Sequence, residues 1–219
     1  MDLEQQLAAA RARRDAAQKA LASKHKGGEW DEYRAADKAL LAAERELAAA
    51  RNEEHAVPLE FPVEWDRGAP LPQLLVNDYR ALLLFFAKVP DPKWDGTYVT
   101  IKDPSSNQSE ALALVEFKHC LSAKLGSPND EVFHGHPLAG KGLEGYTAQL
   151  VKSSRWIAEI QKINSVHAGY RADAWVKPNH YVFWFHDTTF ECIAEAFEVE
   201  LHQCSMSELL AQASRRLIK

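Results

Sequence analysis

The chain has 219 residues, of which 46% are hydrophobic and 26% are charged, and these proportions are ordinary for a globular protein. Its formal net charge of -5 argues against a nucleic-acid partner, because nucleic-acid-binding proteins need a basic surface to neutralise phosphates. No apolar run approaches the ~20 residues of a membrane-spanning helix, and the N-terminus lacks the pattern of a secretory signal. The three cysteines, Cys120, Cys192 and Cys204, cannot all pair within the chain. Reduced thiols and a cytoplasmic location away from membranes are therefore expected.

Residues 1–53 are predicted to form an antiparallel helical hairpin. This region contains no proline, and it is dominated by alanine and other strong helix formers. Apolar residues recur at steps of three and four before Gly27–Gly28, with Arg14 as an interruption, and at steps of seven after it. This spacing is typical of two coiled-coil helices joined by a turn. Since alanine buries little area, we expect the hairpin to pack on the following domain, on a second copy or on a partner protein.

Residues 54–72 are predicted to be a proline-rich linker in which Phe61, Val63 and Trp65 alternate like an extended segment docked on a domain. Strands are predicted at 79–88, 97–102, 111–121, 146–151, 180–186 and 191–201. Helices are predicted to start at Ser153 or Ser154 and at Ser205, which forms a capping box with Glu208. Residues 73–219 are thus expected to form an α+β domain with a mainly antiparallel curved sheet or half-barrel.

Two stretches are rich in residues that can carry chemistry. The first, PNDEVFHGHPL at 128–138, contains His134 and His136, and Pro137 favours an extended backbone before it. If both histidines are extended, their imidazoles point to one side and could start a site for Zn, Fe, Cu or Ni. The second stretch, HYVFWFHDTTFEC at 180–192, offers His186 as a third ligand. A divalent transition metal on these three histidines is therefore one hypothesis.

In that hypothesis the protein is a metal-dependent enzyme, with Glu191 or Asp187 as the catalytic base acting on bound water. Either carboxylate reaches the site only if the chain turns at Thr188–Thr189. A second hypothesis is a metal-free cleft, in which the ligand-binding residues are His134, His136, His186, Trp184 and Lys141. Lys141 lies in a glycine-rich loop that lacks the P-loop pattern and that we expect to be mobile. A third is that the histidines are structural, with Asp187 as the hydrogen-bond partner of His186.

The strings PNDE…HGHPL…GKGL and HYVFWFHDTTFEC resemble those of small uncharacterised bacterial proteins. The resemblance covers residues 117–195 and excludes the helical hairpin. It implies that the two stretches form one recurring surface, and no activity is attached to it. The leading expectation is a binding or accessory protein that uses the histidine-rich cleft for a ligand and the hairpin for dimerisation or docking. The alternatives are the metal-dependent enzyme and an immunity-type protein that neutralises a partner.

Overall fold

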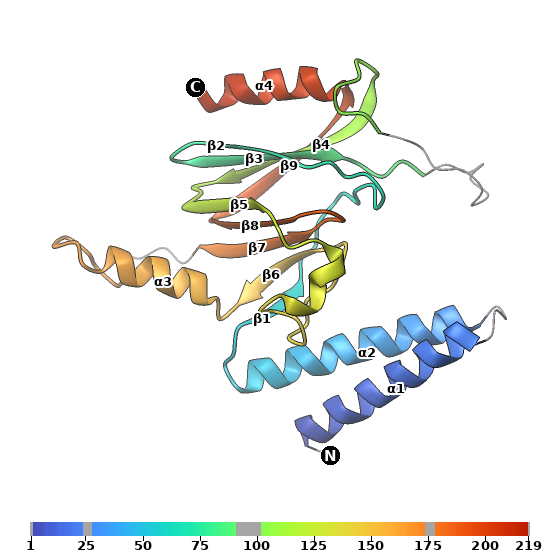
Figure 1. The fold of residues 1–219 in the computed structure, drawn as a ribbon. Coiled ribbons are helices and arrows are strands. Elements are labelled where there is room, and N and C mark those ends of the chain that lie inside the picture. The colour runs from blue at the N-terminus through green and yellow to red at the C-terminus, as the bar shows by residue number, and fades with distance from the viewer. Residues whose placement is uncertain (1, 24–27, 91–101, 174–177, 219) are drawn as a thin grey trace. The chain divides into compact units, whose positions relative to one another are not determined.

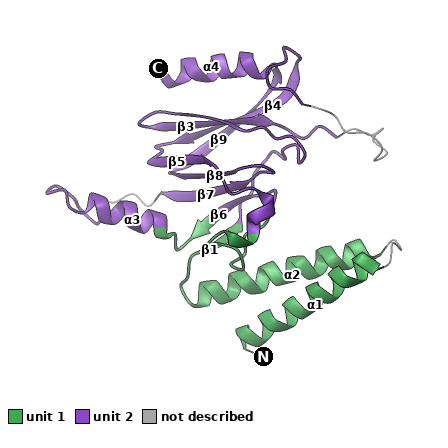
Figure 2. Cartoon of the chain, in the orientation of Figure 1, with its two compact units in different colours: residues 1–57, 134–144, 151–155 green, residues 58–133, 145–150, 156–219 purple. Residues whose placement is uncertain are grey.

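The computed structural model describes residues 2–23, 28–90, 102–173 and 178–218 (Figure 1). The chain divides into two compact units (Figure 2). The first unit contains residues 1–57, 134–144 and 151–155, and the second contains 58–133, 145–150 and 156–219. The strand predicted at 97–102 lies outside the described residues, apart from Lys102. No helix in the described ranges is both long and apolar enough to cross a membrane.

The first unit contains the predicted helical hairpin, formed by α1 (Leu3–Ser23) and α2 (Glu29–Ala50), which pack together. The buried contacts involve small side chains such as Ala17 and Ala36. Arg14, which interrupts the apolar seam, lies with its guanidinium 5.6 Å from the centre of the Tyr33 ring and 3.4 Å from the Asp37 carboxylate. A cation–π contact and an ion pair thus take the place of an apolar residue at this position.

Two antiparallel sheets follow, and together with the hairpin they confirm the predicted α+β class. One sheet has the order β1-β6-β7-β8-β5, and the other has the order β2-β3-β4-β9. The strands of the first sheet are β1 (His55–Pro58), β6 (Ala148–Lys152), β7 (Asn179–Trp184), β8 (Thr189–Ala194) and β5 (Ser122–Gly126). Those of the second are β2 (Gln73–Val76), β3 (Arg80–Phe86), β4 (Glu110–Lys118) and β9 (Ala196–Cys204). The short strands β1, β2 and β5 were not predicted from the sequence, and the single strand predicted at 191–201 is instead two strands, β8 and β9, in different sheets.

The second unit has two hydrophobic cores. The larger core is rich in aromatic rings from both sheets, among them Phe85, Phe117 and Phe183. The smaller lies on the opposite face of β3 and β4, which is covered by α4 (Met206–Ile218). Because β3 faces both cores, it is buried on both sides, as its continuous apolar run predicts. The predicted capping box begins α4: the Ser205 amide donates to Glu208 Oε2 at 2.9 Å, and the Glu208 amide donates to Ser205 Oγ at 3.3 Å.

The segment predicted as a linker contributes to this larger core. The Trp65 ring is 4% exposed and stacks on Phe183, with their centres 5.8 Å apart and the planes 14° from parallel. Phe61 meets the same phenylalanine edge-on at 4.9 Å. The alternation of Phe61, Val63 and Trp65 therefore marks a segment that is docked by its aromatic side chains.

Candidate functional site

The tight connection between β7 and β8 presents His186 and Asp187 to solvent. Trp184 pairs with Thr189 as the last rung of the ladder, and the Phe185 amide donates to the Thr188 carbonyl at 3.0 Å. The turn is therefore centred on His186 and Asp187, two residues before Thr188–Thr189. His186 Nδ1 lies 2.8 Å from Asp187 Oδ1, so the turn brings this carboxylate to the imidazole.

A second segment is fastened to the same turn. The Asp130 amide donates to the His186 carbonyl at 3.0 Å, and Thr189 Oγ1 donates to the Pro128 carbonyl at 2.8 Å. These bonds place Asp130 Oδ2 at 3.7 Å from His186 Nε2. The two ring nitrogens of His186 thus face two different carboxylates, Nδ1 that of the adjacent Asp187 and Nε2 that of the distant Asp130.

Tyr146 completes this group, which we call the His186 cluster: Asp130, Tyr146, His186 and Asp187. The Tyr146 hydroxyl donates to Asp130 Oδ2 at 2.5 Å. The Tyr146 backbone has a φ of 60°, in the left-handed region that a non-glycine residue seldom adopts. The surrounding fold therefore holds Tyr146 there at a cost in strain. Burial and the bond to Asp130 raise the pKa of Tyr146 to about 12. The hydroxyl therefore stays protonated and remains a donor at neutral pH.

The cluster is accessible and carries more negative than positive charge. The side chains of His186 and Asp187 are 42% and 69% exposed. The hydrogen bond that His186 donates to Asp187, and then the negative charges of Asp130, Asp187 and Glu131, raise the pKa of His186. Among the described residues, no lysine or arginine forms an ion pair with these three carboxylates. His186 partly neutralises them, and the Arg67 guanidinium, 6.0 Å from the centre of the Tyr146 ring, adds a second positive charge beside the cluster.

The raised pKa predicts how stability depends on pH. The folded protein holds the His186 proton more tightly than the unfolded chain, so protonation stabilises the folded state below the ordinary histidine pKa of about 6.5. This contribution is lost as the pH rises through the raised pKa. We expect the melting temperature of the wild type to fall over that interval. This part of the fall should be absent in His186→Gln. Circular dichroism melts in a pH series test it, with the exposed His167→Gln as the control. An unchanged pH profile in His186→Gln would contradict the assignment.

His134 and His136 belong to the first unit, whereas His186 belongs to the second. The condition that His134 is extended is not met, because it lies in the 3₁₀ segment η1 (Asp130–Gly135). His136 is buried, and its Nδ1 accepts the Leu138 amide at 3.2 Å. Within the described parts of the chain, no three histidine, cysteine, aspartate or glutamate side chains are placed to hold one metal ion. The geometry assumed for the metal hypothesis is therefore not found there.

The glycine-rich loop, which was expected to be mobile, is hydrogen-bonded to α2 through Gly142. Buried Glu44 accepts the Gly142 amide at 3.1 Å, and Arg45 Nη2 donates to the Gly142 carbonyl at 2.8 Å. Lys141 Nζ lies 3.5 Å from the Glu53 carboxylate. Lys141, predicted as a ligand contact, is therefore part of the packing within the first unit.

Glu191 is paired with His180 instead of the other predicted site residues. Its Oε2 lies 2.9 Å from His180 Nε2, and its Oε1 lies 2.7 Å from Lys124 Nζ. Trp156 covers this group, with its ring 5.3 Å from the His180 ring and 4.9 Å from the Lys124 ammonium. The side chains of His180 and Glu191 are 4% and 8% exposed. A carboxylate so enclosed is poorly placed to act as a base on a substrate.

The remaining predicted ligand contact, Trp184, is fully buried and meets Phe133 edge-on at 4.8 Å.

Sequence reasoning missed Asp130 and Tyr146 as site residues. Asp130 had a visible signal, since it stands in the same acidic and histidine-rich stretch as His134. Tyr146 had none, because its role depends on a left-handed backbone and on a contact 16 residues away.

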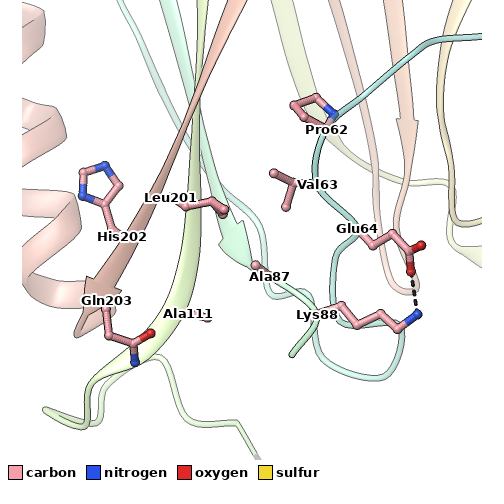
Figure 3. A pocket seen from close by; sticks show the side chains of 9 residues that line it. All are labelled: Pro62, Val63, Glu64, Ala87, Lys88, Ala111, Leu201, His202 and Gln203. Atoms are coloured by element: carbon pink, nitrogen blue, oxygen red, sulfur yellow. Dashed lines mark hydrogen bonds and ion pairs between the residues drawn. The ribbon is translucent and has the colours of Figure 1, made fainter. Parts of the chain in front are cut away.

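A shallow pocket of about 380 Å³ lies in another part of the second unit (Figure 3). Its lining comes from the docked segment, the ends of β3 and β4, and β9: Pro62, Val63, Glu64, Ala87, Lys88, Ala111, Leu201, His202 and Gln203. The Lys88 ammonium pairs with Glu64 at 2.5 Å beside this mostly apolar lining. None of the residues predicted from the sequence as site residues lines it.

The His186 cluster therefore stands as the candidate site, since it joins two distant segments around an accessible titratable group. Comparison of the chain with protein-family models, with curated proteins and with solved structures finds no match.

Proposed function

We propose that the protein is a cytoplasmic binding or accessory protein that holds a positively charged group of a small ligand or of a protein segment at the His186 cluster. The observation that carries this proposal is the gathering of three carboxylates, Asp130, Glu131 and Asp187, around one half-exposed histidine. Carboxylate oxygens accept hydrogen bonds from amines, and they match the paired donors of a guanidinium. The chemistry of the site thus favours a cationic ligand group.

Two further features support binding. The Tyr146 hydroxyl and the backbone bond to His186 fix Asp130 before any ligand arrives, which reduces the ordering cost of binding. His186 itself acts as an internal competitor, because its protonated ring occupies the carboxylates. Affinity for a cationic ligand should therefore rise as the pH rises through the raised pKa of His186.

Titration with a triarginine peptide tests the proposal, with triglutamate as the charge-reversed control. We expect triarginine to shift the His186 ring signals in NMR spectra, and Asp187→Asn to weaken its binding roughly three- to tenfold, the loss of one charge-assisted hydrogen bond. Asp78→Asn, an exposed carboxylate elsewhere in the second unit, serves as the matched control. Equal affinities of wild type and Asp187→Asn would overturn the proposal.

We also propose that the helical hairpin serves self-association. Its support is Trp30, which is 61% exposed near the start of α2 and touches Tyr33 edge-on at 6.0 Å. Exposed tryptophan is enriched in protein interfaces because it buries a large area with little loss of side-chain entropy. Light scattering should give two copies per particle for wild type and a shift toward one copy for Trp30→Ser. The exposed Tyr79→Ser, in the other unit, should leave the state unchanged. A single copy in wild type at all concentrations would contradict this role.

The metal-dependent alternative finds no ligand group in the described parts of the chain, and no observation there favours an immunity-type protein. We therefore propose neither.

A further inference from the structure

Two cysteines far apart in sequence lie in contact in the larger core. Cys120 Sγ and Cys192 Sγ are 3.5 Å apart, although 72 positions separate them in the chain. Cys192 lies in the middle of β8, opposite Ala123 of the edge strand β5. Cys120 lies in the short connection between β4 and β5, and the next residue, Leu121, donates its amide to the Ile193 carbonyl at 2.8 Å. Strand pairing between β5 and β8 therefore brings the two thiols together.

The two thiols differ in their access to solvent. Cys192 is completely buried, whereas Cys120 is 5% exposed and stands between exposed His119 and Leu121, which is 51% exposed. Cys120 is thus the thiol that a small molecule from solvent would meet first. The third cysteine, Cys204, lies on β9 in the other sheet.

We propose that Cys120 and Cys192 form an intramolecular disulfide when the protein meets hydrogen peroxide. In the first step, the Cys120 sulfur attacks one peroxide oxygen and the O–O bond breaks; the Cys120 proton leaves with the other oxygen as water, and Cys120 becomes a sulfenic acid. In the second step, the Cys192 sulfur attacks the Cys120 sulfur, and the hydroxyl leaves with the Cys192 proton as a second water. The two thiols lose two electrons in total, and the peroxide gains them.

The electrostatics around the pair support this order of attack. The hydrogen bond from Cys192, and to a lesser degree that from the Ser122 amide, lower the pKa of Cys120 against the effect of burial. The hydrogen bond to Cys120 and complete burial raise the pKa of Cys192. The thiolate is the nucleophile in this chemistry, so Cys120 is the attacking group and Cys192 resolves the sulfenic acid.

Bond formation requires a small movement. A disulfide sulfur pair lies about 2.05 Å apart, so the thiols must approach by about 1.5 Å. The Cys120 amide donates to the Tyr79 carbonyl at 2.9 Å and Cys192 is paired within β8, so rotation of the two side chains has to bring the sulfurs together. The bond would join the start of the edge strand β5 covalently to β8.

The test is oxidation of the intact purified chain with hydrogen peroxide, followed by denaturation, maleimide labelling and mass spectrometry. We expect the number of labelled thiols to fall from three to one, and peptide mapping to show a Cys120–Cys192 link within one chain. Cys204→Ser is the matched control, since it should form the same link at an unchanged rate. Cys120→Ser and Cys192→Ser should each be unable to form it.

Measurement on the wild-type chain decides the proposal even if a cysteine variant does not fold. The proposal would be overturned if Cys120 and Cys192 were both still labelled after oxidation and Cys204 were the one oxidised thiol. A disulfide joining two chains through Cys204 as the sole product would also overturn it. Recovery of three labelled thiols after treatment with a reductant distinguishes the disulfide from irreversible oxidation and is the expected result.

Discussion

Replacement of Gly142 by alanine should lower the free energy of unfolding by about 3 kcal/mol, which a urea denaturation series would measure. A Cβ at this position would lie 2.3 Å from Arg45 Cγ and 2.7 Å from the Ala56 carbonyl oxygen. Its backbone also has a φ of +81°, which alanine adopts only with strain. The substitution would therefore push the loop away from α2 and break the bonds that Gly142 makes with Glu44 and Arg45.

Gly140→Ala provides the matched control. Gly140 has a similar φ of +73°, but a Cβ there would meet no atom within 4 Å. It should cost only about 1 kcal/mol, the strain of the left-handed backbone alone. Equal losses for the two variants would show that the close approach of α2 to Gly142 does not contribute to stability.

Glu191→Ala should destabilise the protein by roughly 1 to 3 kcal/mol in the same assay, the cost of a buried polar atom that loses its hydrogen-bond partner. The substitution removes the carboxylate that His180 and Lys124 share, and it leaves a buried imidazole facing an apolar side chain. Removal of one partner costs more than the hydrogen bond contributes, because the buried His180 Nε2 atom loses the Glu191 carboxylate. Such a loss would identify Glu191 as a structural residue rather than a catalytic base.

Glu198→Ala is the control for this prediction. Glu198 pairs with Lys118 across the β4–β9 ladder, and its side chain is 64% exposed. Exposed pairs contribute about 0 to 1 kcal/mol, so this variant should unfold close to wild type. A stable Glu191→Ala protein would contradict the buried role assigned to the His180 pair.

The elements that sequence predicts correctly are those with a strong local signal. The alanine-rich periodicity specifies both helices of the hairpin, the run of apolar residues specifies β3, and Ser205 with Glu208 specifies the start of α4. Strand β5, with the sequence SAKLG, has little alternation of its own. It exists because β8 offers it a partner, and such pairing is not encoded locally.

The candidate site could be predicted only in part for the same reason. His186 and Asp187 are adjacent, so a single turn decides their contact, and the sequence indicates that turn. Asp130 reaches them through backbone bonds between segments more than 50 residues apart. His180 lies six residues from His186 along the chain, and it pairs instead with Glu191 on the neighbouring strand, a contact that depends on the strand register.

The contact between α2 and the glycine-rich loop has a consequence for synthesis on the ribosome. Glu44 and Gly142 are 98 positions apart, and translation proceeds at about 5 to 20 residues per second. Both helices therefore emerge roughly 5 to 20 seconds before the loop that satisfies Glu44 and Arg45. During that interval the nascent hairpin displays a carboxylate and a guanidinium that the finished protein encloses. Completion of the first unit thus waits on the second half of the chain.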